Sequence, residues 1–260
     1  MILCLDIGNT NIKIGLFEGN ELKYSFRGAT ELKRTSDEYG TIFTNMFELQ
    51  GVSPDAVDGA IISSVVPALN YTIQRMCIGY FGVEPLMVGC GLKTGHNLRV
   101  DDAREVGSDR IVNDVAAVQK YGAPLIVIDF GTATTFNAVN AQGEFIGGAV
   151  APGIRGSVDS LVSGTAKLPR VEIERPRCAI GKNTTTNMQA GIVFGFAGLV
   201  EYIVKKMKKE LKDPNVRVVA TGGFSEIIAK ETSCIDCVDK LLTLQGLKYL
   251  YDLNNSEDAK

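Results

Sequence analysis

The chain has 260 residues, which predicts one or two domains, and its 45% hydrophobic and 22% charged residues exclude wholesale disorder. Its net charge of -3 lacks the basic excess that nucleic-acid-binding proteins carry, so we expect no nucleic-acid partner. Glycine occurs 28 times, about one residue in nine against a usual ~7%, which indicates many turns or close backbone approaches.

The apolar segments predict neither a leader nor a membrane span. The chain reaches Asp6 without the cationic region and the cleavage site of a signal peptide. The longest apolar stretch, roughly residues 191–200, is short for a bilayer and is followed by Glu201. The lysine run at 205–209 closes that segment and is typical of a solvated helix end. We therefore expect a cytoplasmic protein that does not contact a membrane.

Cysteine and histidine contribute little to the predicted chemistry. The six cysteines should be reduced in the cytoplasm. Cys234 and Cys237 form a lone Cys-x-x-Cys pair, which is a weak zinc signal, so we expect a structural or incidental role for them. His96 is the single histidine of the sequence, which excludes histidine-rich metal sites.

The hydrophobic patterns of the first hundred residues predict strands and helices in turn. Alternating apolar residues on both sides of the turn after Asp6 predict two strands within residues 2–17. The next expected elements are a helix around 35–50, a strand at 59–64, a helix that begins at Pro67 and a short strand at 83–88.

A second block of the same kind begins near Ser108. Its first element is a helix that Gly122 and Pro124 close. The following elements are expected as strands at 125–128, 136–139, 145–150 and 216–220, and as helices at 156–163, 188–211 and 244–253.

An internal repeat relates the two blocks. An apolar strand, Asp-x-Gly, a hydroxyl-rich turn and another apolar strand occur at Asp6 and again at Asp129. Two copies predict two similar α/β halves that face each other across a cleft. We place these halves at residues 1–115 and 116–260.

The repeated turn has the chemistry of a phosphate site. A strand that ends in Asp-x-Gly presents a carboxylate, and the glycine lets successive N–H groups form an anion-binding nest. Two such turns would hold a polyphosphate, and the carboxylates of Asp6 and Asp129 are oxygen ligands that suit Mg²⁺ or a monovalent cation. Each turn alone is also explained as a hairpin, although neither has the sequence of a tight two-residue one. The glycine turn at 221–223 is a weaker candidate for contact with a nucleoside.

The segment Gly107–Arg110 opens a helix, where N–H groups and the helix dipole attract anions. Ser108 or Asp109 would then serve as an ordinary helix cap. In the alternative, Asp109 accepts a proton from an attacking hydroxyl, and Arg110 binds a carboxylate or phosphate of the substrate. A positioned aspartate suits phosphoryl transfer, because positioning and charge stabilisation supply most of that catalysis.

Six short motifs follow one another along the chain. They are Asp-Ile-Gly-Asn-Thr-Asn at 6–11, Gly-Ser-Asp-Arg at 107–110, Asp-Phe-Gly-Thr-Ala-Thr-Thr at 129–135, Gly-Gly-Ala-Val-Ala-Pro-Gly at 147–153, Gly-Lys-Asn-Thr at 181–184 and Ala-Thr-Gly-Gly at 220–223. Together with Leu-Thr-Leu-x-Gly-Leu at 242–247, this set resembles type III pantothenate kinases of the actin-like ATPase and sugar-kinase superfamily. The resemblance implies an α/β fold of two tandem ribonuclease-H-like halves with a cleft between them. It also implies a homodimer that phosphorylates pantothenate with ATP, the first step of coenzyme A synthesis.

The resemblance also assigns roles to individual residues. The ATP phosphates would be bound by Asp6, Ile7, Gly8, Asn9, Thr10, Asn11, Ile12, Lys13 and Thr132. Asp109 would be the general base within a pantothenate site built from Gly107, Ser108, Asp109 and Arg110. Thr184 would reach pantothenate across the dimer interface. Asp129 would bind a potassium or ammonium ion, and Asp6 would hold Mg²⁺ through water.

The segment before Gly107 departs from the family pattern. Members usually carry a tyrosine about seven residues before that glycine and then Asn-Pro, where this chain has Val100 followed by Asp-Asp-Ala. Ser108 also replaces a commoner alanine. This departure bears on pantothenate binding more than on catalysis. Two alternatives stay open: a regulatory accessory protein of the same family without kinase activity, and a phosphotransferase that acts on another small alcohol.

Overall fold

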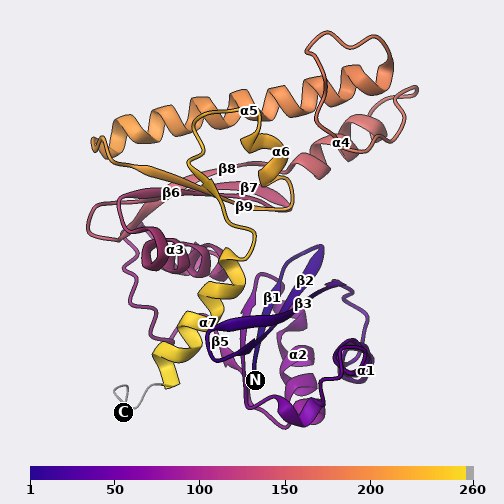
Figure 1. Ribbon diagram of the computed structural model, residues 1–260, viewed down its shortest axis with the longest axis vertical. Coiled ribbons are helices and arrows are strands. Elements are labelled where there is room, and N and C mark those ends of the chain that lie inside the picture. The colour runs from indigo at the N-terminus through magenta and orange to yellow at the C-terminus, as the bar shows by residue number, and fades with distance from the viewer. Residues whose placement is uncertain (256–260) are drawn as a thin grey trace. The chain divides into compact units, whose positions relative to one another are not determined.

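The computed structural model describes residues 1–255, which form two compact units (Figure 1). Unit 1 comprises Met1–Gly95, Arg104–Ala116 and the described residues from Thr243 on. Unit 2 comprises His96–Ala103 and Ala117–Leu242. Each unit is built around one five-stranded sheet.

The sheet of unit 1 has the strand order β3-β2-β1-β4-β5. Its strands are β1 (Ile2–Ile7), β2 (Asn11–Glu18), β3 (Glu21–Ala29), β4 (Gly59–Ser64) and β5 (Leu86–Met87). Strand β2 runs antiparallel to both of its neighbours, β1 and β3, whereas β4 and β5 run parallel to β1. The strands expected within 2–17 and at 59–64 are confirmed, but β3 is absent from the expected elements. Its Leu22, Tyr24 and Phe26 alternate with polar residues, which is the period-2 pattern of a half-buried strand, so the sequence carried a signal for β3 that was overlooked.

Helices cover both faces of the first sheet. On one face, Leu3 and Leu5 of β1 pack against α1 (Ser36–Glu48) and α2 (Pro67–Phe81). Helix α1 begins with a capping box of Thr35 and Glu38, and α2 begins at a proline, whose fixed φ suits a first helical position. On the other face, Cys4 packs with residues of α3 (Ser108–Tyr121) and α7 (Leu242–Asn255).

The sheet of unit 2 repeats the topology of the first. Its order is β10-β9-β6-β7-β8, and its strands are β6 (Leu125–Phe130), β7 (Ala133–Val139), β8 (Phe145–Pro152), β9 (Arg217–Gly222) and β10 (Cys237–Val238). Strands β6, β7 and β8 are antiparallel, and β9 and β10 run parallel to β6. Asp6 and Asp129 are each the last residue but one of the central strand. The predicted repeat is therefore present in the topology.

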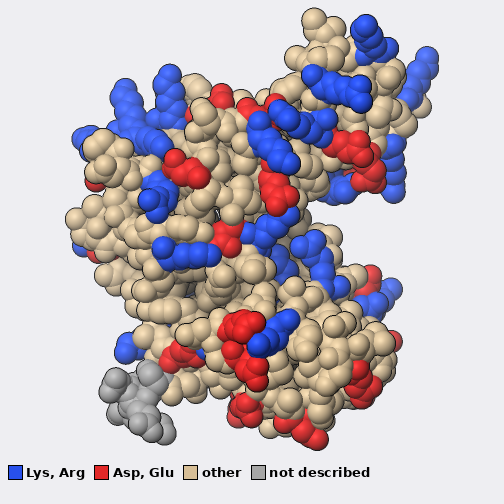
Figure 2. All heavy atoms as spheres, in the orientation of Figure 1, with Lys and Arg blue, Asp and Glu red and all other residues tan. Residues whose placement is uncertain are grey.

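Unit 2 also contains α4 (Ile154–Ser163), α5 (Thr184–Leu211) and α6 (Ser225–Ala229). The described part of the chain further includes the short 3₁₀ helices η1 (Pro54–Ala56) and η2 (Ala103–Glu105). Helix α5 begins earlier than predicted, and among the described residues it is the one helix long and apolar enough for a membrane span. Val193, Phe196 and Val200 of α5 are buried in the core of unit 2, which explains its apolar character. On the face drawn in Figure 2, basic side chains gather at the C-terminal end of α5. Over the rest of this face, acidic and basic side chains are interspersed.

The division of the chain at 115/116 stays a prediction about two ribonuclease-H-like halves. The compact units change over at nearly the same place, after Ala116, but from Thr243 on the chain returns to unit 1. The reason is packing, because Leu244, Leu247 and Leu250 of α7 are buried against Cys4 and other residues of unit 1. The periodicity of α7 predicts a helix and does not tell which sheet the helix covers.

Candidate active site

The carboxylate of Asp6 lies in a row of side chains that crosses the sheet of unit 1. The register places Asp6 beside Lys13 of β2 and beside Ser63 of β4. Directly paired residues project from the same face of a sheet, and Lys13 Nζ lies 2.9 Å from Asp6 Oδ2. Asp6 is 6% exposed. A buried carboxylate and a partly buried ammonium therefore meet at the carboxyl end of β1.

The turn after Asp6 connects β1 and β2 as a hairpin and is held from one side by β3. The N–H of Gly8 donates to the carbonyl of Asn11 at 3.0 Å. Thr30, directly after β3, donates its hydroxyl to the carbonyl of Gly8 at 2.6 Å and its N–H to the carbonyl of Thr10 at 3.1 Å. Asn9, Thr10 and Asn11 are exposed. Thr30 was not among the predicted site residues, because β3 was not among the expected strands.

The first residue of α3 attaches this helix to the sheet. Ser108 Oγ accepts from the N–H of Ser64 at 3.0 Å and donates to the carbonyl of Ser64 at 3.1 Å, and it lies 2.9 Å from Ser63 Oγ. One expectation was that Ser108 caps its own helix. Its hydroxyl instead bonds to residues at the end of β4. The residue beside Asp6 in the sheet is thereby joined to the residue before Asp109.

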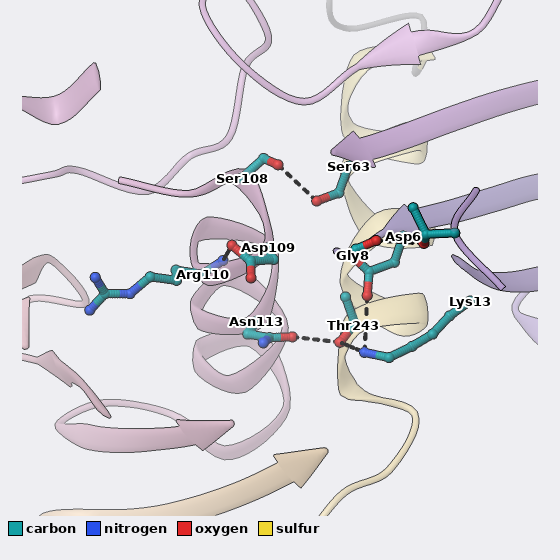
Figure 3. Close-up of polar contacts among 10 residues, drawn as sticks. Asp6, Gly8, Lys13, Ser63, Ser108, Asp109, Arg110, Asn113 and Thr243 are labelled. Atoms are coloured by element: carbon teal, nitrogen blue, oxygen red, sulfur yellow. Dashed lines mark hydrogen bonds and ion pairs between the residues drawn. The ribbon is translucent and has the colours of Figure 1, made fainter. Parts of the chain in front are cut away.

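Asp109 lies in the first turn of α3, where its Oδ1 accepts from the N–H of Arg110 at 2.9 Å. A carboxylate has about four lone-pair sites, so this bond is compatible with proton acceptance. A Cβ at Gly107 would lie 2.5 Å from Asp109 Oδ1, so the carboxylate rests against the α-carbon of that glycine. Arg110 extends away from Asp6 and Gly8 (Figure 3). Burial lowers the pKa of Arg110, and the charges of Asp114 and Asp109 oppose that shift.

A chain of polar contacts that sequence reasoning missed runs behind Lys13. Lys13 Nζ donates to Thr243 Oγ1 at 3.4 Å, and Thr243 Oγ1 donates to Asn113 Oδ1 at 2.8 Å (Figure 3). Thr243 and Asn113 are each 2% exposed. The available signals were the motif at 242–247, whose threonine was given no role, and a polar residue within the apolar stripe of α3.

In unit 2 the equivalent row of side chains is different. The register places Asp129 between Thr135 of β7 and Thr221 of β9, so two hydroxyls stand where Asp6 has a lysine and a serine. Gly222 follows with φ +92°, and a Cβ there would lie 2.5 Å from Asp129 Oδ1. The carboxylate of Asp129 therefore lies against glycine backbone.

The turn that carries Thr132 joins β6 to β7. The last paired residues are Phe130 and Thr134, so three residues, Gly131, Thr132 and Ala133, connect them, and the turn is not a two-residue hairpin. Gly131 and Thr132 are exposed. A Cβ at Gly153 would lie 2.0 Å from the carbonyl oxygen of Thr132, so the N-cap residue of α4 touches this turn directly. The motif at 147–153 thus supports the turn.

The remaining predicted residue, Thr184, is the exposed first residue of α5 and follows the N-cap Asn183. The segment that lacks the family tyrosine lies along the beginning of β8. Its Leu98 forms a bridge with Phe145, and Arg99 Nε lies 2.8 Å from Glu144 Oε2. The pKa of Glu144 is lowered, first by a hydrogen bond from Asn140 and then by Arg99.

The Cys-x-x-Cys pair has the surroundings of ordinary thiols. Burial raises the pKa of both Cys234 and Cys237, which disfavours the thiolate that binds metals. The described residues contain no group of three or more His, Cys, Asp or Glu side chains that could hold a metal ion.

Comparison with known proteins gives the family and the fold. The family model of type III pantothenate kinase matches residues 2–206. The type III pantothenate kinase of Geobacter sulfurreducens is 50% identical over 254 residues, which are 98% of this chain and 99% of that protein.

Two solved structures share the fold at low sequence identity. A provisionally named 2-dehydro-3-deoxygalactonokinase from Sinorhizobium meliloti is 11% identical with a TM-score of 0.65, over 98% of this chain and 97% of that one. A provisionally named Baf family transcriptional activator from Campylobacter jejuni is 17% identical with a TM-score of 0.61, over 97% and 98%. These likenesses concern the fold alone, and the expected α/β fold of sugar-kinase type is confirmed. By the family model and the near full-length relative, the chain belongs to the type III pantothenate kinase family.

Proposed function

We propose that this chain is an ATP-dependent kinase that phosphorylates pantothenate to 4'-phosphopantothenate, the first step of coenzyme A synthesis. The observation that carries this proposal is the 50% identity to the Geobacter sulfurreducens enzyme over nearly the whole length of both chains. This chain has all three aspartates of the phosphate and base motifs, Asp6, Asp109 and Asp129.

In the reaction, a hydroxyl oxygen of pantothenate attacks the γ-phosphorus of ATP. The new O–P bond forms as the bond between the γ-phosphorus and the β,γ-bridging oxygen breaks, ADP leaves, and the hydroxyl proton passes to the carboxylate of Asp109. The turn from Asp6 to Lys13 in unit 1 and Thr132 in unit 2 bind the ATP phosphates. In support, these turns end the central strands, and their residues at 9–11 and 131–132 are exposed.

A monovalent cation, potassium or ammonium, fits the surroundings of Asp129. The carboxylate lies against Gly222, where a Cβ would fill the space, and its neighbours in the register are two threonines instead of a lysine. Oxygen donors of this kind suit a hard cation. Such an ion would supply positive charge beside the ATP phosphates. Mg²⁺ fits as an ion that arrives with ATP and contacts Asp6 through water, since Mg²⁺ keeps several of its waters in protein sites.

Pantothenate is bound by Gly107, Ser108 and Arg110, with Thr184 contributed by the second subunit of a homodimer. The exposed face of α5 supports the dimer. Nothing lies within 4 Å of a Cβ built at Gly191, Gly195 or Gly198, whereas Val193 and Phe196 on the same helix are buried. Glycines on one face of a helix permit the close approach of a second helix. We place the enzyme in the cytoplasm, without nucleic-acid or membrane partners.

The test is an ADP-release assay with and without pantothenate, in potassium, ammonium or sodium buffer. Wild-type protein should release ADP only with pantothenate and should depend on potassium or ammonium. Asp109→Asn should lower kcat by roughly 10²–10⁴-fold, the usual contribution of a general base, while ATP still binds. Absence of turnover in the folded wild-type protein would overturn the proposed function, and an unchanged kcat in the variant would overturn the role of Asp109.

A regulatory protein without kinase activity is the second candidate. One structural neighbour carries the name of a transcriptional activator, but at 17% identity it bears on the fold alone. Failure of the gene to rescue a strain without pantothenate kinase, with soluble protein present, would favour this candidate. A phosphotransferase with another small alcohol as acceptor would instead show a different preferred substrate in a panel of alcohols.

A further inference from the structure

We propose that Thr243 is a positioning residue, which sets the place of the Lys13 ammonium toward the ATP phosphates and anchors it on α3 through Asn113. This inference rests on the proposed kinase function. It assigns a task to a threonine that lies 230 residues from Lys13 in the chain and that none of the predicted roles includes.

The chemistry of the three side chains fixes which one donates in each of the two hydrogen bonds. A lysine ammonium can only donate, so Thr243 Oγ1 must accept from Lys13 Nζ over their 3.4 Å separation. The single hydroxyl hydrogen of Thr243 is then directed to Asn113 Oδ1, 2.8 Å away. Asn113 thus orients the hydroxyl so that its lone pairs face the ammonium.

Lys13 is held between unlike partners. Asp6 Oδ2 lies 2.9 Å from its Nζ on one side, and the neutral hydroxyl of Thr243 accepts from it on the other (Figure 3). Without that hydroxyl, the ammonium loses an acceptor that opposes the attraction of the Asp6 carboxylate. It would move toward Asp6, away from the position in which it meets a phosphate oxygen.

Packing makes the position of Thr243 rigid. A Cβ at Gly246, one turn further along α7, would lie 2.4 Å from the carbonyl oxygen of Val112, so α7 lies directly against α3. Leu244 lies beside Gly15 of β2, at 3.2 Å from a Cβ built there. The beginning of α7 is therefore held against both the strand that carries Lys13 and the helix that carries Asn113.

The anchor also lies on the helix of the proposed general base. Asn113 is four residues after Asp109, and residues with this spacing share one face of a helix. Thr243 therefore joins the phosphate-binding end of the sheet to the face of α3 that carries Asp109. Its loss should affect ATP more than pantothenate, because its direct contact is with Lys13.

The experiment is a double-mutant cycle of Thr243→Val and Lys13→Met, read by the KM for ATP and by the Kd of ATP from calorimetry. Valine keeps the volume of threonine and removes the hydroxyl. We expect Thr243→Val to raise both constants roughly 3- to 10-fold, the net worth of one typical hydrogen bond, with the KM for pantothenate unchanged. In the Lys13→Met background the same substitution should change them less than twofold, and Thr243→Ser should remain close to wild type.

Equal effects of Thr243→Val in both backgrounds would overturn the proposal, because they would show a merely structural role. Unchanged ATP constants in the single variant would also overturn it. If Thr243→Val does not fold, Asn113→Ser replaces it in the double-mutant cycle, because Asn113 is the other partner of the Thr243 hydroxyl. The same rise in the KM and Kd for ATP is expected, and it has the same interpretation. The calorimetric arm needs no pantothenate, so failure of the proposed function would leave this test intact.

Discussion

At the scale of single residues, Gly107 shows how a missing side chain serves a functional group. Its backbone lies outside the left-handed region, so an alanine is conformationally acceptable there. The added Cβ would nevertheless stand 2.5 Å from Asp109 Oδ1. Because that atom is the end of a side chain, the carboxylate would move and the backbone would remain.

Gly107→Ala should therefore lower kcat by roughly 10- to 100-fold, since a displacement of about 1 Å at a reacting group has effects of this size. The KM for ATP and the melting temperature should change little. Steady-state kinetics and thermal unfolding provide the measurement. Gly79→Ala on α2 is the matched control, because nothing lies within 4 Å of the new Cβ and kcat should stay as it is. A Gly107→Ala enzyme within twofold of the wild-type kcat would contradict the prediction.

At the scale of elements, helix α3 depends on the hydroxyl of its first residue. Ser108→Ala removes a group that contacts the Ser63 hydroxyl and both backbone polar groups of Ser64. Leaving such groups partly unsatisfied costs about 1–2 kcal/mol, and the looser helix start should also lower kcat several-fold. Urea unfolding and kinetics measure the two effects.

Thr35→Ala separates stability from activity in that measurement. It removes the side chain of the capping box that begins α1, which should cost about 1 kcal/mol. Since α1 supplies none of the proposed site residues, kcat should not change. If both alanine variants keep full kcat, Ser108 stabilises the fold without orienting Asp109.

The sequence predicted the positions of strands and helices better than the contacts between them. Apolar alternation located the strand at 59–64, and the proline at 67 located the start of α2, because both signals are local. The ion pair of Asp6 and Lys13 depends on the register of a hairpin, which the pattern alone leaves open. The contact of Thr243 with Asn113 joins residues 130 apart in the chain. No local signal indicates such a pairing, so Thr243 entered the site only through the structure.

At the scale of the whole molecule, the two units share one topology but differ in how the chain completes them. Unit 1 takes α7 from the far end of the sequence, and Leu247 of that helix is fully buried with Phe17 and Ile61. The repeat of Asp6 and Asp129 predicted two similar sheets, but it did not indicate that α7 packs against the first of them.

Leu247→Ala should cost about 2–5 kcal/mol, the usual range for a buried leucine. Because the cavity lies in unit 1, hydrogen exchange should rise first in β1, β2 and β4 and less in β6 and β9. Exchange measured by mass spectrometry after peptic digestion resolves these strands. Equal acceleration in both sheets would show that the two units unfold as one body.

The return of the chain to unit 1 has a consequence during protein synthesis. The strands that carry Asp6, Lys13 and Ser63 leave the ribosome early, but the helix that covers Cys4 and Phe17 follows only after residues 117–242. At 5–20 residues per second, that interval lasts roughly 6–25 s. Throughout it the nascent chain has α3 but lacks α7, the second of the two helices that cover this apolar sheet face. Because Thr243 begins this last segment of unit 1, the Lys13 ammonium acquires its contact with Thr243 only after residues 117–242 have been made, and no shorter fragment contains the complete network.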